Sequence, residues 1–248
     1  MTTTPPAPPV AARAHGAVKV YGERDTEVRA LNGVDAAFEA ARFSTIMGPS
    51  GSGKSTLMHC MAGLDDLSEG QVFIGDIDLT SLSEKELTLL RRERIGFVFQ
   101  AFNLIPTLSA LENITLPMSL AGRTPDQAWL DHVVTTVGLA DRLSHRPNEL
   151  SGGQQQRVAV ARALASRPEI IFADEPTGNL DSRTGAEILQ FMREAVDELG
   201  QTIVMVTHDP VAAGYSDRAI FLTDGSITGE MANPTSESVF DYLKTLGD

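Results

Sequence analysis

The sequence predicts an α/β fold in which a mostly parallel sheet carries helices on both faces. Three stretches predict buried strands because each is apolar throughout, namely residues 95–99, 170–173 and 202–206. The clearest helix covers residues 183–199, where the apolar side chains form one stripe and Gly200 follows the last turn. Strands that alternate with helices in this way form parallel sheets.

The N-terminal part predicts a smaller, mostly antiparallel β subdomain. Residues 1–14 are rich in proline and are expected to form a disordered tail, which leaves residues 15–248 as the folded domain. Short strands are predicted near residues 18–22, 27–31, 34–38 and 72–74, with turn residues between them.

The middle of the chain predicts an inserted α-helical subdomain over about residues 102–165. Before it, residues 83–86 have a capping-box pattern that opens a helix. Within it, residues 124–127 give a second capping box with Pro125 at the first helical position, and the helix after residue 150 extends to about residue 165. Residues 101–120 are unusually apolar for a connecting segment.

A glycine-rich loop lies between a short apolar strand and a helix. It comprises Gly48, Pro49, Ser50, Gly51, Ser52, Gly53, Lys54, Ser55 and Thr56. The glycines let successive backbone N–H groups face one anion, the lysine brings charge to the outer phosphates, and Ser55 offers a hydroxyl to Mg²⁺. A Gly/Ser-rich surface loop is the alternative, which the flanking strand and helix disfavour. The loop predicts a P-loop NTPase core that binds a nucleoside triphosphate.

Composition excludes other classes of function. The formal net charge of −13 opposes binding to nucleic acid. The single cysteine, Cys60, permits no intrachain disulfide and favours a reducing compartment. We expect neither a signal peptide nor a membrane-spanning segment, so a role at a membrane would require docking onto an integral protein.

Polar residues follow the predicted strands where parallel sheets bind ligands: Gln100, Asp174, Glu175 and His208. Asp174 and Glu175 are expected to point to different sides. Asp174 could hold Mg²⁺, and Glu175 could act as the general base or orient the attacking water. His208 could donate to the γ-phosphate, and Gln100 could contact metal or water. Alternatively, the acidic pair is only a solvated loop and the histidine is structural.

A second glycine-rich helix start contains Ser151, Gly152, Gly153 and Gln154 but no lysine. A helix N-terminus of this kind can cradle an anion. Alternatively, it is an ordinary capped helix whose glycines permit close packing. Because one phosphate loop already holds one nucleotide, a second cradle is useful if it closes over a nucleotide held by another copy of the chain.

Taken in order, residues 48–55, Gln100, residues 150–154, residues 170–175 and His208 resemble the nucleotide-binding subunit of an ABC transporter. The resemblance covers essentially residues 17–229. It implies that ATP and Mg²⁺ bind, that Tyr21 stacks on adenine and that Glu175 is the catalytic base. It also implies a head-to-tail dimer, with Asp181 at the dimer contact. Ser151 and Gly153 of one subunit would cap the γ-phosphate that the other holds.

Three further sequence motifs resemble one branch of that family. Glu112-Asn113, residues 150–157 and residues 176–181 are similar to the macrolide-export, lipoprotein-release and FtsE-like ATPases, of MacB/LolD type, and bacitracin-type ATPases share much of it. This implies a subunit on the cytoplasmic, inner face of the cell membrane that drives a MacB/LolD/FtsX-like permease docked between Phe102 and Leu120. One departure is residues 40–42, where the family usually has a Gly-Glu turn.

Two alternatives come from other classes of protein. One is an FtsE-like signalling ATPase that regulates an extracytoplasmic partner without moving cargo. The other is a soluble ABC ATPase of DNA repair or translation, which fits poorly because the chain has neither a long coiled-coil insert nor a second cassette, and its charge opposes nucleic acid.

Overall fold

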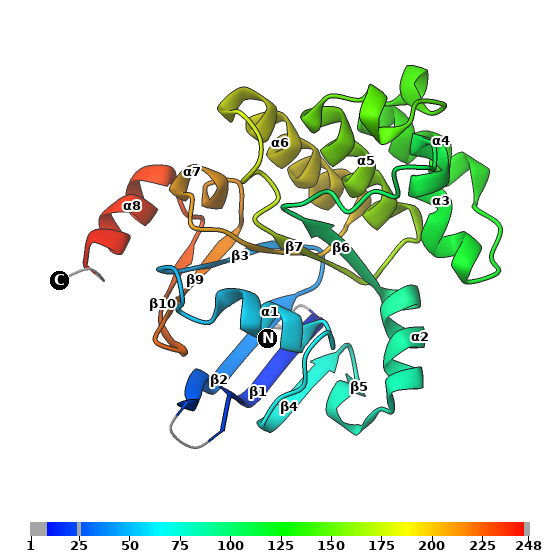
Figure 1. Ribbon diagram of the computed structural model, residues 1–248. Coiled ribbons are helices and arrows are strands. Elements are labelled where there is room, and N and C mark those ends of the chain that lie inside the picture. Colours follow the sequence, from blue (N-terminus) through cyan, green and yellow to red (C-terminus); the bar gives the residue numbers. More distant parts are fainter. Residues whose placement is uncertain (1–8, 24–25, 246–248) are drawn as a thin grey trace, which may run out of the picture.

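Two sheets and a helix packed between them organise the chain, which a computed structural model describes over residues 9–23 and 26–245 (Figure 1). The larger sheet has the strand order β10-β9-β3-β8-β7-β6, in which only β10 is antiparallel to its neighbour. Its strands are β3 (Phe43–Met47), β6 (Ile95–Phe99), β7 (Ile170–Asp174), β8 (Ile203–Val206), β9 (Arg218–Thr223) and β10 (Ser226–Ala232). The predicted α/β class is confirmed.

The smaller sheet is antiparallel, as predicted, and has the order β2-β1-β4-β5. Its strands are β1 (Val10–Tyr21), β2 (Val28–Glu39), β4 (Glu69–Ile74) and β5 (Ile77–Asp78). The predicted tail was wrong for residues 10–14, because they belong to β1, in which Val10 pairs with β2 and residues 12–14 pair with both β2 and β4. Residues 1–8 of that tail lie outside the described residues. The two strands expected at 27–31 and 34–38 are one strand, since Gly33, at φ +73°, forms a bulge instead of a turn.

Helices cover the larger sheet and fill the insert. They are α1 (Lys54–Met61), α2 (Glu84–Arg94), α3 (Ala110–Leu120), α4 (Gln127–Thr136), α5 (Gly152–Ala165), α6 (Ser182–Leu199), α7 (Pro210–Ala213) and α8 (Ser236–Thr245), with short 3₁₀ turns at Leu79–Ser81, Ala140–Arg142 and Pro147–Glu149. The capping box of α2 is present as predicted. Pro125 is not the first helical residue, because the Asp126 side chain caps α4 by accepting from Trp129 N.

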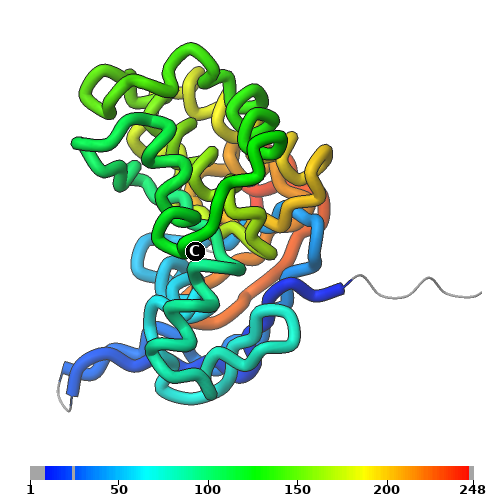
Figure 2. Tube along the Cα trace, turned by 90° about the vertical axis from the view of Figure 1, so that its right-hand side faces the viewer, coloured from blue at the N-terminus to red at the C-terminus, as the bar shows by residue number. Residues whose placement is uncertain are grey.

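Two hydrophobic cores lie on opposite faces of the larger sheet, and alternate residues of the central strands β7 and β8 enter different cores. Ile171 and Ala173 pack with α3 to α6, whereas Ile170 and Phe172 pack with α1 and the antiparallel sheet. This alternation explains why the central strands are apolar throughout. Figure 2 shows the insert (green) on the side of the molecule opposite to the antiparallel sheet (blue and cyan).

The C-terminal part had no element predicted beyond β8. There, α8 packs on β9 and β10, with the Phe221 and Tyr242 rings 4.1 Å apart between centroids. Over residues 9–23 and 26–245, no helix is both long enough and apolar enough to cross a bilayer.

Candidate active site

The glycine-rich loop fits tightly against the ends of two strands. Gly48 has φ +148°, and a Cβ on it would lie 2.0 Å from the carbonyl oxygen of Leu222. Gly53 has φ +99°, and a Cβ there would lie 2.3 Å from the carbonyl oxygen of Ala30. Both positions therefore require glycine for conformation and for space. The loop is followed directly by α1, as the phosphate-binding pattern predicts.

Lys54 folds back over this loop. Its ammonium group donates to the carbonyl oxygen of Pro49 at 2.7 Å, and the residue is 8% exposed. Burial lowers the pKa of Lys54, while the nearby carboxylates of Glu175 and Asp174 act in the opposite direction. The cation therefore lies between the phosphate-binding loop and the acidic end of β7.

The carboxyl end of β7 contacts the start of α1. The Ser55 hydroxyl donates to Asp174 Oδ1 at 3.2 Å, and His59 Nε2 lies 3.8 Å from Asp174 Oδ2. Burial raises the pKa of Asp174, and the Ser55 hydrogen bond and His59 oppose this. A hydroxyl and a carboxylate that meet in this way are oxygen donors of the kind that Mg²⁺ takes.

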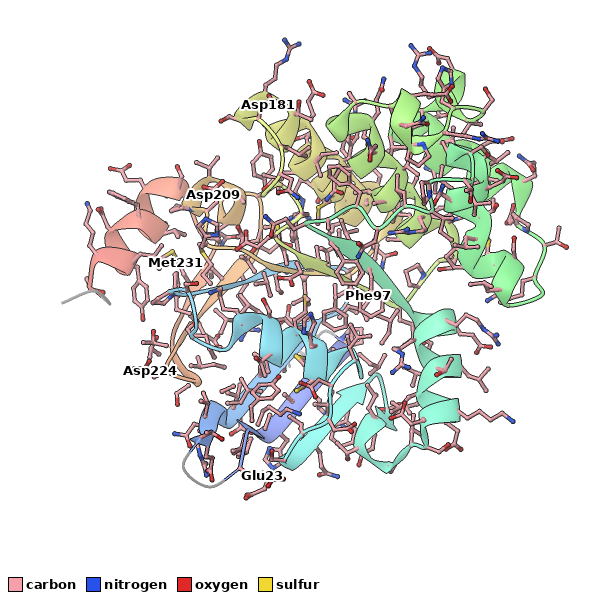
Figure 3. The ribbon with its side chains drawn as sticks, viewed as in Figure 1. Glu23, Phe97, Asp181, Asp209, Asp224 and Met231 are labelled. Atoms are coloured by element: carbon pink, nitrogen blue, oxygen red, sulfur yellow. The ribbon has the colours of Figure 1, made fainter. Side chains whose placement is uncertain are left out.

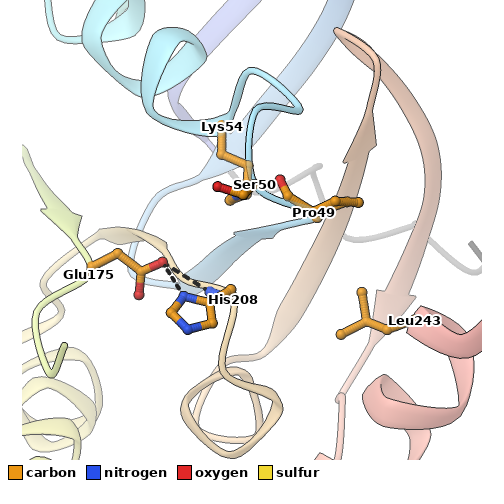
Figure 4. A pocket seen from close by; sticks show the side chains of 7 residues that line it. Pro49, Ser50, Lys54, Glu175, His208 and Leu243 are labelled. Atoms are coloured by element: carbon orange, nitrogen blue, oxygen red, sulfur yellow. Dashed lines mark hydrogen bonds and ion pairs between the residues drawn. The ribbon is translucent and has the colours of Figure 1, made fainter. Parts of the chain in front are cut away.

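Glu175 points away from that pair, as expected, and toward the end of β8. Its Oε1 accepts from His208 N at 3.1 Å and lies 2.7 Å from His208 Nδ1 (Figure 4). Its Oε2 accepts from the hydroxyl of Thr207 at 3.1 Å. The backbone of Glu175 has φ +45°, a conformation that residues other than glycine rarely adopt. The strained backbone and the contacts with Thr207 and His208 hold this carboxylate in one orientation.

Gly48, Lys54, Glu175 and His208 line one cavity of about 450 Å³, whereas Ser55, Asp174 and Thr207 do not line it. Its lining residues are Gly48, Pro49, Ser50, Lys54, Glu175, His208 and Leu243 (Figure 4). Sequence reasoning missed Thr207 and Leu243. The signal for Thr207 was its place beside His208, directly after a buried strand, whereas Leu243 belongs to the unpredicted α8.

Gln100 and Tyr21, which were predicted to contact the nucleotide or its metal, are hydrogen-bonded to other residues of the chain. Gln100 Nε2 donates to Asn179 Oδ1 at 3.3 Å, and Asn179 Nδ2 donates to the carbonyl oxygen of Gln100 at 2.9 Å. Gln100 does not line the cavity. The Tyr21 hydroxyl donates to Asp65 Oδ2 at 2.5 Å, and Lys19 Nζ lies 4.9 Å from the centroid of its ring. Tyr21 is 41% exposed, and Lys19 lies over its ring.

The second glycine-rich turn lies outside the cavity. Ser151 caps α5 by accepting from Gln154 N at 3.3 Å, and Gln154 Oε1 accepts from Ser151 N at 2.9 Å. A Cβ on Gly153 would lie 2.3 Å from Thr184 Cγ2, so the close-packing role left open by the sequence applies to Gly153. Asp181 accepts from the Thr184 hydroxyl at 2.7 Å and caps α6. Figure 3 shows Asp181 at an outer end of the molecule.

A family model described as ABC transporter matches residues 31–178, more than half of the chain. The chain belongs to this family. This ABC chain is 46% identical over 219 residues to the uncharacterized ABC transporter ATP-binding protein MJ0796 of Methanocaldococcus jannaschii, covering 86% of this chain and 93% of that protein. It is 43% identical over 235 residues to the bacitracin export ATP-binding protein BceA of Halalkalibacterium halodurans, covering 92% of each.

Similarity extends to a longer protein and to solved structures. The chain is 48% identical over 217 residues to the macrolide export ATP-binding/permease protein MacB of Bdellovibrio bacteriovorus, covering 87% of this chain but 33% of that protein. A dimeric structure of the cassette MJ0796 in a post-hydrolysis state, bound to ADP and Pi, matches with a TM-score of 0.80 and 42% identity over 90% of this chain and 98% of that one. The predicted family, fold and ABC-type ATPase activity are confirmed.

Proposed function

We propose that this ATPase drives a MacB/LolD/FtsX-like permease by ATP-dependent head-to-tail dimerisation at the inner face of the cell membrane. The observation that carries the proposal is the division of the site. Lys54, Glu175 and His208 of one chain line one cavity, and Ser55 and Asp174 of the same chain meet in a hydrogen bond, but the second anion cradle does not line that cavity. A second copy would supply that cradle.

Within one chain, each group has a role that fits its contacts. The loop N–H groups and Lys54 would hold the phosphates, and Tyr21 would stack on adenine. Ser55 and Asp174 would hold Mg²⁺, which neutralises phosphate charge when bound. Gln100 would join them once its side chain turns from Asn179 to the metal. Glu175 takes the proton of the attacking water, and His208 contacts the γ-phosphate.

Across the dimer, Ser151, Gly152, Gly153 and Gln154 of the partner would cap the γ-phosphate through the N-terminus of α5. Asp181 would lie at the contact between the chains, since its loop adjoins α5 through Thr184. Dimeric structures of the MJ0796 cassette support this arrangement.

The permease would dock between Phe102 and Leu120. One face of α3 is committed to the core of the insert, because Ala110, Ile114 and Met118 are buried there. The other face remains available, since Leu111 and Leu120 are exposed and Leu116 lines a groove beside α2. We propose that this apolar stretch forms part of the core of the insert with one face of α3 and the docking surface with the other.

The test is Glu175→Gln, which removes the base and keeps the shape of the side chain. We expect ATP binding to persist, hydrolysis to fall at least a hundredfold and an ATP-dependent dimer to accumulate, as measured by size-exclusion chromatography. Lys54→Ala is the matched control, because it weakens ATP binding and should leave the chain monomeric. Wild-type hydrolysis by Glu175→Gln would refute the base assignment, and full activity of a strictly monomeric preparation would refute the divided site.

A further inference from the structure

Gln156 is a fully buried amide side chain on α5, the helix that Ser151 caps. Its Nε2 atom donates to the carbonyl oxygen of Phe99 at 3.3 Å and also to the carbonyl oxygen of Pro176. Its Oε1 atom is buried too and has no hydrogen-bond partner among the described residues. A buried acceptor without a partner costs stability. The chain therefore keeps a costly amide here and uses it only as a donor to two backbone carbonyls.

The two carbonyl groups belong to the neighbours of two proposed site residues. Phe99 is the last residue of β6 and precedes Gln100, whereas Pro176 directly follows Glu175 at the end of β7. Within residues 9–23 and 26–245, no other donor reaches the carbonyl oxygen of Pro176. Gln156 is thus the side chain that ties the turn after the base to α5.

The backbone at Glu175 requires such a restraint. Its φ of +45° lies in the left-handed region, whereas a residue that precedes a proline prefers an extended conformation. Strained conformations of this kind persist only where several contacts hold them. On one side, Glu175 N donates to the carbonyl oxygen of Val206 at 2.9 Å. On the other side, the hydrogen bond from Gln156 holds Pro176.

The same amide also reaches the strand that leads to Gln100. Gln100 and Asn179 exchange two hydrogen bonds, so Gln100 contacts the loop that follows Glu175. The contact is close, because a Cβ on Gly178 would lie 2.8 Å from Gln100 Nε2. One nitrogen atom of α5 therefore holds both chain segments that carry the proposed base and the proposed metal ligand.

We propose that Gln156 is a positioning residue for ATP hydrolysis, which holds Glu175 and Gln100 of its own chain in place across the ends of β6 and β7. The inference rests on the proposed function, since it takes Glu175 as the base. Gln156 does not line the cavity, so it acts without touching ATP. Its effect lies in its own chain, although the same helix begins with the cradle at Ser151 that would serve the partner's nucleotide.

The first test is Gln156→Met, which keeps an unbranched side chain and removes both donated hydrogen bonds. We expect kcat to fall about ten- to a hundredfold, because a misplacement of about 1 Å can cost a hundredfold in rate. The affinity for ATP should stay within about threefold, since the phosphate loop is unchanged. Gln155→Met is the matched control. Gln155 lies on the same helix but donates to Leu150 O at 3.1 Å, so its change should retain kcat within about threefold.

Mixed dimers show in which chain Gln156 acts. A little wild-type chain is mixed with a large excess of Glu175→Gln chain before ATP is added, so nearly every wild-type chain pairs with an inactive one. The initial rate of phosphate release then reports the wild-type site, whose cradle comes from the changed partner. Adding Gln156→Met to that partner should leave this rate within about twofold, because the base of that partner is already absent. Adding Ser151→Arg instead should lower it about tenfold, because the arginine blocks the cradle.

Three results would overturn the inference. The first is a wild-type kcat in Gln156→Met, and the second is a loss of ATP affinity as large as its loss of kcat. The third is a mixed-dimer rate that falls as far with Gln156→Met as with Ser151→Arg, which would show that Gln156 merely keeps α5 and its cradle folded. If the mixture with Ser151→Arg keeps the full rate, or Glu175→Gln alone hydrolyses ATP like the wild type, the proposed function itself fails, and the inference fails with it.

Discussion

Thr207 is predicted to position the carboxylate of Glu175. Its side chain is fully buried, its hydroxyl donates to Glu175 Oε2 at 3.1 Å, and the same hydroxyl accepts from Asp209 N at 3.1 Å. Thr207→Val keeps the branched shape but removes both hydrogen bonds.

The size of the effect follows from these contacts. A hydrogen bond to a charged group contributes about 1.5–3 kcal/mol. If this contact holds the base in its reactive orientation, its loss lowers kcat by roughly ten- to a hundredfold, since 1.36 kcal/mol corresponds to a factor of ten. The affinity for ATP should change little, because Thr207 does not line the cavity. Loss of the acceptor for Asp209 N should cost about 1 kcal/mol of stability, which lowers Tm by about 2–4 °C in a chain of this size.

Steady-state phosphate release gives kcat, and fluorescence of a labelled ATP analogue gives its affinity. Thr207→Ser is the matched control, because it keeps the hydroxyl and should retain kcat within about threefold. A Thr207→Val protein with the wild-type kcat would show that the contact plays no part in catalysis. A large loss of ATP affinity would assign Thr207 to binding instead.

Two further predictions concern stability. Ala41 has φ +55°, so Ala41→Gly should raise the free energy of unfolding by about 0.5–1 kcal/mol in urea titrations, whereas Ala40→Gly should lower it; equal losses would refute strain at Ala41. Burial raises the pKa of Asp65, but hydrogen bonds from Lys19 and Tyr21 outweigh this and hold it below its ordinary value. A carboxyl with a lowered pKa in the folded state stabilises the fold above its unfolded pKa of about 4 and loses this contribution as pH falls through the folded pKa. Asp65→Asn should therefore be less stable at pH 7 and lose less stability between about pH 5 and pH 2; parallel pH profiles would contradict this.

Local signals were sufficient for the phosphate loop, for the capped starts of α2 and α5 and for the buried strands. Gly48 and Gly53 identify the loop because other residues cannot adopt their backbone conformations. The Ser151 capping box lies within four consecutive residues, so it can be read locally. The ends of the strands at Asp174 and His208 followed from the rule that parallel strands present their carboxyl ends at one edge.

The predicted element boundaries were wrong where contacts in the folded chain override the local sequence pattern. Val10 to Ala14 look like the end of a proline-rich tail, yet they are strand because residues 12–14 pair with β2 on one side and β4 on the other. Pro125 fitted the first helical position, but the carboxylate of Asp126 caps the helix, which therefore begins at Gln127, two residues later.

What the sequence determined by itself was the chemistry available to this protein: a phosphate loop, an acidic pair, a histidine and a second glycine-rich turn. Only the tertiary structure decided which groups face one another. It placed the Thr207 hydroxyl on Glu175, Leu243 at the cavity, and the Gln156 amide on the carbonyl oxygens of Phe99 and Pro176. The physical reason is that these contacts join residues far apart along the chain or depend on side-chain direction, which packing fixes and local sequence does not.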